Sequence, residues 1–74
     1  MTEKQLRKAA EIVRSSAGAR RTLEKVQRDL ARQHPDALIY AEMADGLRDE
    51  AEELDALAHE LDKAAMAARE ERNG

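Results

Sequence analysis

The chain has 74 residues, 42% of them hydrophobic and 39% charged, and it contains one Tyr but no Cys, Phe or Trp. A chain of this length forms at most one domain and buries only about 60% of the surface of its unfolded form, so its stability is marginal without association. The lack of cysteine excludes disulfides as extra support, and the lack of a long apolar stretch or signal segment predicts a cytoplasmic protein that does not cross a membrane. The abundance of Ala, Leu, Glu, Arg and Lys predicts an all-α fold.

The first predicted helix extends from about residue 3 to about residue 33. Thr2 and Gln5 have the spacing of a capping box, in which the two side chains satisfy backbone N–H groups at the start of a helix. Apolar or small residues then recur every three or four positions, as one buried helix face requires. These residues are Leu6, Ala9 or Ala10, Val13, Ser16 or Ala17, Leu23, Val26 and Leu30. Because Gly18 costs about 1 kcal/mol inside a helix, two alternatives remain: one continuous helix, or a break at 15–18 that gives three helices.

Pro35 is the one proline of the chain, and it predicts a turn at residues 34–35. The residue before a proline avoids the helical conformation, whereas proline itself suits the first turn of the next helix. Asp36 would then place its negative charge near the positive end of the second helix dipole. We expect that helix to extend from about residue 36 to about residue 70, followed by a frayed tail over 71–74.

The second predicted helix has a seven-residue repeat. With Tyr40 as position a, the a series continues through Leu47, Leu54, Leu61 and Ala68. Position e is alanine four times, at residues 44, 51, 58 and 65, and position d holds Met43, Glu50, Leu57 and Ala64. A leucine stripe beside an alanine stripe lets two helices approach closely, and the seven-residue period favours a left-handed coiled-coil crossing.

Folding the chain back at the proline gives an antiparallel two-helix hairpin. Facing residue numbers would add to about 70, so that Leu23 faces Leu47 and Val13 faces Leu57, with large residues often opposite small ones. Charge supports the same pairing: residues 1–34 carry nine Lys or Arg and four Asp or Glu, whereas residues 35–74 carry four and twelve. A basic helix would thus lie beside an acidic one.

The tripeptide His34-Pro35-Asp36 resembles the signature of J-domain co-chaperones, which lies between two antiparallel helices and contacts a heat-shock chaperone. The chain has about J-domain length, and a basic helix that ends Asp29-Leu30-Ala31-Arg32 precedes the tripeptide. The resemblance implies a co-chaperone contact at His34, Pro35 and Asp36. The sequence departs from the family pattern at Gln33, where an aromatic residue is usual, and in the helix that follows Asp36 at once. The alternative is that the tripeptide only ends a helix.

The remaining candidate sites are weak in the sequence. His59 has Asp55 and Asp62 about one turn away on either side, but this spacing does not match that of di-iron bundles, and we predict neither a metal nor a cofactor. A two-helix hairpin also lacks the enclosed pocket that catalysis needs, so we predict no enzymatic activity. The basic first helix could contact phosphates, but the acidic second helix and the lack of stacking aromatics make nucleic acid the less favoured partner.

We therefore expect a non-enzymatic interaction module that acts through apolar helix faces. The predicted core and interface residues are Leu6, Val13, Leu23, Val26, Leu30, Tyr40, Met43, Leu47, Leu54, Leu57 and Leu61. Further apolar residues such as Ile12 and Met66 exceed what one partner helix can cover, which predicts a homodimeric four-helix bundle. The alternative is a complex with a larger protein that has an apolar helical surface, as for a secretion chaperone, phage inhibitor or adaptor.

Overall fold

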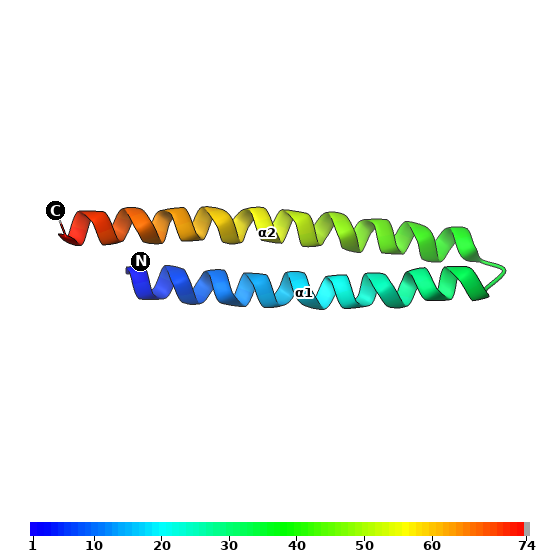
Figure 1. The fold of residues 1–74 in the computed structure, drawn as a ribbon. Helices are drawn as coiled ribbons and strands as arrows, with labels where there is room; N and C mark the ends of the chain where they lie inside the picture. The colour runs from blue at the N-terminus through cyan, green and yellow to red at the C-terminus, as the bar shows by residue number, and fades with distance from the viewer. Residues whose placement is uncertain (74) are drawn as a thin grey trace.

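The computed structural model describes residues 1–73 as two long α-helices that form an antiparallel hairpin (Figure 1). Helix α1 spans Glu3–Gln33 and helix α2 spans Ala37–Asn73. The two helices lie in contact along α1, and α2 extends beyond the start of α1 (Figure 1). The predicted all-α hairpin is confirmed.

The start of α1 has the predicted capping box. The backbone N–H of Thr2 donates to Oε1 of Gln5 at 2.9 Å, and the backbone N–H of Gln5 donates to Oγ1 of Thr2 at 3.2 Å. The helix continues without a break through Gly18, whose carbonyl accepts a hydrogen bond from the hydroxyl of Thr22 at 3.2 Å. Of the two alternatives for this stretch, the structure has the continuous helix.

The turn between the helices consists of residues 34–36. The backbone N–H of His34 donates to the carbonyl of Leu30 at 3.0 Å, and the carbonyl of Asp36 accepts from the backbone N–H of Ile39 at 3.1 Å. Pro35 lies within this turn, and α2 begins at Ala37, one residue after the predicted start. Of the predicted frayed tail over 71–74, residues 71–73 belong to helix α2, and residue 74 lies outside the described residues.

The seam between the helices is built on the alanine series of α2. Ala44, Ala51, Ala58 and Ala65 are at most 1% exposed, and the a series from Tyr40 to Ala68 is half-buried beside them. The alanine side chain is a single methyl group, so a seam built on alanine allows the two helix axes to approach closely. The Leu/Ala seam predicted for α2 is confirmed.

The seam side of α1 is mainly apolar in its first half and mainly polar in its second half. Leu6, Ala10 and Ala17 are buried, but the same seam continues through Arg20, Glu24, Gln27 and Ala31, which are half-buried. Leu23 and Val26, which the predicted stripe placed in this seam, are 50% and 48% exposed. The prediction is wrong for Leu23 and Val26, because α1 follows the regular seven-residue repeat of α2 while these apolar residues lie to one side of that line.

The interhelical ion pairs join residues whose numbers add to between 70 and 76. The sum is 70 for Arg20–Glu50, 73 for Arg28–Asp45, and 76 for both Arg14–Asp62 and Arg21–Asp55. Side chains in a helix lean toward its N-terminus, so an arginine of α1 can reach an acidic residue beyond the one it faces. Leu57, expected opposite Val13 in the seam, is 50% exposed.

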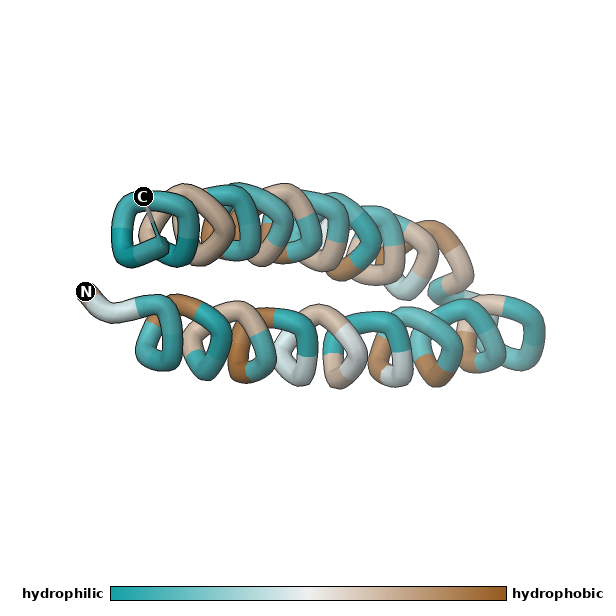
Figure 2. The backbone as a smooth tube through the Cα atoms, turned by 60° about the vertical axis from the view of Figure 1, so that its left-hand side comes forward, coloured by the Kyte–Doolittle hydropathy of each residue, from teal (hydrophilic) through white to brown (hydrophobic). Residues whose placement is uncertain are grey.

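The hairpin is long and thin for its mass. Its Cα atoms extend over 60 × 13 × 13 Å with a radius of gyration of 17.0 Å, whereas a compact domain of this length has about 11 Å. It exposes 5464 Å², against about 4600 Å² for a typical folded monomer of this mass. Figure 2 shows hydrophobic segments recurring along both helices. The exposed area of the hairpin thus exceeds that of a typical monomer by about 900 Å², which is close to the area that one partner contributes to a standard protein interface.

Candidate interaction surface

One side of the hairpin is a charged face, built on arginines seven residues apart in α1. Arg14 and Arg21 pair with Asp62 and Asp55, which are themselves seven residues apart in α2. Arg28 pairs with Asp45 at 3.1 Å. A fourth interhelical pair, between Arg20 and Glu50, lies on the other side of the hairpin. All four pairs join a basic residue of α1 to an acidic residue of α2. The predicted charge complementarity within the hairpin is confirmed.

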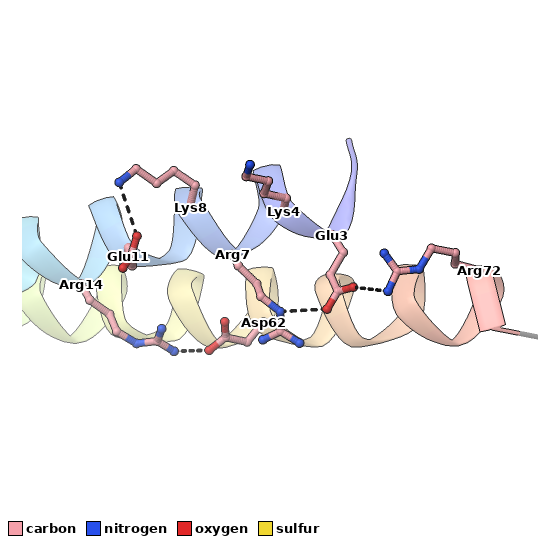
Figure 3. A pocket seen from close by; sticks show the side chains of 8 residues that line it. All are labelled: Glu3, Lys4, Arg7, Lys8, Glu11, Arg14, Asp62 and Arg72. Carbon is pink, nitrogen blue, oxygen red and sulfur yellow. Dashed lines mark hydrogen bonds and ion pairs between the residues drawn. The ribbon is translucent and has the colours of Figure 1, made fainter.

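The charged face begins with Arg7, the first arginine of the series. Glu3 accepts from Arg7 at 3.0 Å and from Arg72 at 3.2 Å, which ties the start of α1 to the end of α2 (Figure 3). These residues belong to an open hollow that is lined by Glu3, Lys4, Arg7, Lys8, Glu11, Arg14, Asp62 and Arg72. Each acidic side chain in the hollow already has a cation beside it.

The ion pairs alter the pKa values of the groups that form them. The hydrogen bond from Arg14 lowers the pKa of Asp62 below its ordinary value of 3.8, and the hydrogen bond from Arg7 lowers the pKa of Glu3 below 4.5. Conversely, the hydrogen bond to Asp55 raises the pKa of Arg21, and those to Glu24 and Asp45 raise the pKa of Arg28. Each shift favours the charged form, so these pairs stay ionised at neutral pH.

Acid should weaken the hairpin through these carboxylates. A group with a lowered pKa in the folded state contributes stability above its unfolded pKa, and that contribution is lost as the pH falls through the folded pKa. We expect the melting temperature to fall as the pH drops below 3.8, the ordinary pKa of Asp62, and D62N to lower it at neutral pH while weakening its dependence on acid. Circular dichroism melts over pH 2.5–7 measure both effects, on the order of a few degrees for exposed pairs.

The matched control for this experiment is D49N. Asp49 is exposed and pairs only with its neighbour Arg48, at 3.4 Å, so its loss should leave the acid dependence unchanged. If D62N and the wild type melted alike at both ends of the pH range, the interhelical pair would contribute nothing to stability.

The opposite side of the hairpin is an apolar face. The side chains of residues i and i+2 in an α-helix point about 200° apart. Leu23 and Leu30 therefore lie across the seam from Arg21 and Arg28. In α2, Leu57 likewise lies across the seam from Asp55. The apolar face comprises Ile12, Leu23, Val26 and Leu30 of α1 with Met43 and Leu57 of α2. Five of these six side chains are 48–58% exposed, and Leu30 is half-buried.

A single interhelical ion pair belongs to this face. Glu50 lies one heptad from both Met43 and Leu57, so it shares their side of α2. Its carboxylate accepts from Nε of Arg20 at 2.9 Å. The apolar face thus carries one positive and one negative group, placed next to each other near the middle of the hairpin.

The predicted core and interface residues divide into three groups. Leu6 is buried, and Leu23, Val26, Met43 and Leu57 are exposed on the apolar face. The third group is half-buried and lies along the seam or at its edges. Its members are Val13, Leu30, Tyr40, Leu47, Leu54 and Leu61. The arginine repeat of α1 was missed at the sequence level. The signal was the spacing of Arg7, Arg14, Arg21 and Arg28, which are seven residues apart like the alanines of the second helix.

The tripeptide His34-Pro35-Asp36 forms the exposed turn between the antiparallel helices. The ring of His34 packs edge-on against Tyr40, with centroids 5.3 Å apart, so the imidazole has a contact within the hairpin. Helix α2 begins directly afterwards, at Ala37. A co-chaperone contact at this turn stays a prediction.

Within residues 1–73, no three or more His, Cys, Asp or Glu side chains come together in a way that could hold a metal ion. His59 is exposed, and its neighbours Asp55 and Asp62 pair with Arg21 and Arg14. Over the same residues, no helix is long and apolar enough to cross a membrane.

Part of the basic first helix, the candidate surface for nucleic acid, is already paired with acidic residues within the hairpin. Arg14, Arg21 and Arg28 each contact an acidic residue of α2. Releasing them for phosphate would leave those carboxylates beside a polyanion, which opposes binding.

Comparison with protein-family models, curated proteins and solved structures gives no match to this chain. Its candidate function therefore follows from its own surface.

Proposed function

We propose that this chain is a non-enzymatic protein–protein interaction module that associates through its apolar face, as an adaptor, chaperone-like subunit or inhibitor would. The observation that carries the proposal is the contrast between core and surface. The buried side chains among residues 1–73 are six alanines and Leu6, whereas the larger side chains of the apolar face are about half exposed. The chain thus keeps most of its large apolar groups outside its own core.

The energetic consequence is considerable for so small a fold. Full burial of a Leu, Ile, Val or Met side chain contributes about 1.5–3 kcal/mol, so a half-exposed one retains about 1 kcal/mol that only a partner can supply. Domains have net stabilities of about 5–15 kcal/mol, and small ones lie at the low end. Covering five such side chains would therefore change the stability of the hairpin appreciably.

The face suits a partner that presents a helical apolar surface. Two hairpins that pack face to face would make a four-helix bundle, in which each covers the exposed side chains of the other. A larger protein with an apolar groove between helices would cover the same residues. Of the two, a second copy is the partner we propose.

Sedimentation and thermal melting of the wild type test this proposal together. A dimer that dissociates on dilution, with a melting temperature that rises with protein concentration, is the expected result, because association stabilises only the folded state. A monomer at high micromolar concentration, melting at one temperature throughout, would exclude self-association. The larger protein would then be the remaining partner.

A further inference from the structure

We infer that the second copy binds with its turn at the same end as the turn of the first, so that α1 of each hairpin lies over α2 of the other. This inference rests on the proposed self-association and adds its geometry. Two face-to-face arrangements have two-fold symmetry. In the same-end arrangement the symmetry axis is parallel to the helices, and in the opposite-end arrangement it is perpendicular to them, so that each helix lies over its own copy.

The distribution of apolar residues favours the same-end arrangement. Four of the six residues of the apolar face lie in the half of the hairpin nearer the turn, and the other two, Ile12 and Leu57, lie beyond its middle. The four are Leu23, Val26, Leu30 and Met43. Rotation about an axis parallel to the helices keeps every residue at its position along the hairpin, so apolar residues meet apolar residues. A perpendicular axis at the centre of α1 would instead place Val26 and Leu30 over the start of that helix, where it has Gln5 and Ala9. If one copy slid along the other until the apolar residues met, the far end of each hairpin would have no partner.

Charge beside the apolar face points the same way. Glu53 and Glu60 are exposed and follow Glu50 and Leu57 by three residues, so they border this face on α2. The corresponding border of α1, at Ile12, Ala19 and Val26, carries no charge. Packing α2 over α2 would bring the two glutamate borders together, whereas packing α1 over α2 keeps them apart and sets the basic helix against the acidic one.

The Arg20–Glu50 pair fits the same arrangement. The two side chains are in contact at 2.9 Å, so they lie at one position along the hairpin. With the axis parallel to the helices, Arg20 of each copy comes over Glu50 of the other, and two opposite pairs face each other. In the opposite-end arrangement each helix lies over its own copy, so an axis through this pair would place Arg20 over Arg20 and Glu50 over Glu50, and like charges would meet.

Distances between spin labels at the two ends of the hairpin decide between the arrangements. The chain contains no cysteine, so E42C and E70C each create one labelling site on an exposed residue. Both positions lie on the side of α2 away from the seam, the first near the turn and the second near the far end. Label-to-label distances are measured by pulsed electron paramagnetic resonance on each labelled dimer, with sedimentation of the same samples.

In the same-end arrangement both variants should give short distances of about 20–35 Å, because the labels are separated only by the width of a four-helix bundle. In the opposite-end arrangement at least one site should exceed about 40 Å, since the hairpin is 60 Å long and each residue adds about 1.5 Å along the axis. A dimer with such a long distance would overturn the arrangement and leave the proposed self-association intact. Monomeric samples, with unlabelled wild type also monomeric, would overturn both.

Discussion

Replacing Ala58 with Leu is expected to lower the free energy of unfolding by about 1–3 kcal/mol, the usual cost of overpacking a tight core. Ala58 is 1% exposed and lies in the segment bracketed by the Arg14–Asp62 and Arg21–Asp55 pairs. The same segment of α1 contributes Ala17, which is fully buried. Three additional carbon atoms at this point have no space unless the helices separate, and separation would strain the ion pairs on the charged face. Chemical denaturation followed by circular dichroism measures the change.

The matched control is A56L, two residues away on the same helix. Ala56 is exposed, and Ala and Leu have similar helix propensities, so this variant should unfold within about 0.5 kcal/mol of the wild type. If A58L were as stable as A56L, the seam would have room for a leucine, and the close approach of the helices would not depend on alanine.

Replacing Leu57 with Asp is expected to weaken self-association at least about 30-fold, or about 2 kcal/mol, because each dimer would then bury two unpaired carboxylates at its interface. Leu57 is 50% exposed on the apolar face, so part of the effect falls on the hairpin itself. Sedimentation equilibrium measures association, and helicity by circular dichroism shows whether the hairpin still folds at the same concentration.

M66D is the matched control for that variant. Met66 is 55% exposed, but it lies one turn after Asp62, which faces Arg14 on the charged side. An aspartate there should leave the dimer within about threefold of the wild type, or about 0.7 kcal/mol. Equal loss of association in both variants would show that the interface is not confined to the apolar face.

The sequence indicated the second helix more fully than the first. The heptad that begins at Tyr40 has alanine at one position four times, so a single buried stripe was the only consistent interpretation, and Ala44 and Ala65 are indeed fully buried. Thr2 and Gln5 defined the start of α1 because a capping box depends only on residues three apart. Pro35 marked the turn for an equally local reason.

For α1 the spacing of apolar residues predicted the wrong buried residues in the part of the helix that follows Ala17. Its apolar residues continue through Leu23 and Val26, and period alone predicts that such residues are buried. In the structure the seam passes instead through Arg20, Glu24 and Gln27. The side chain that faces the partner helix is set by both helices at once, and α2 has the more regular repeat.

By itself, the sequence determined the helical class, the two long helices, the turn and the charge difference between the halves, because each depends on residues near one another in the chain. Only the tertiary structure decided which residues of α1 face α2, and with it the division into a charged face and an apolar face. Arg21 and Leu23 are two residues apart in the chain and lie on opposite sides of the seam. A shift of the seam by one or two residues, too small for periodicity to resolve, would exchange the groups that are buried for the groups that face a partner.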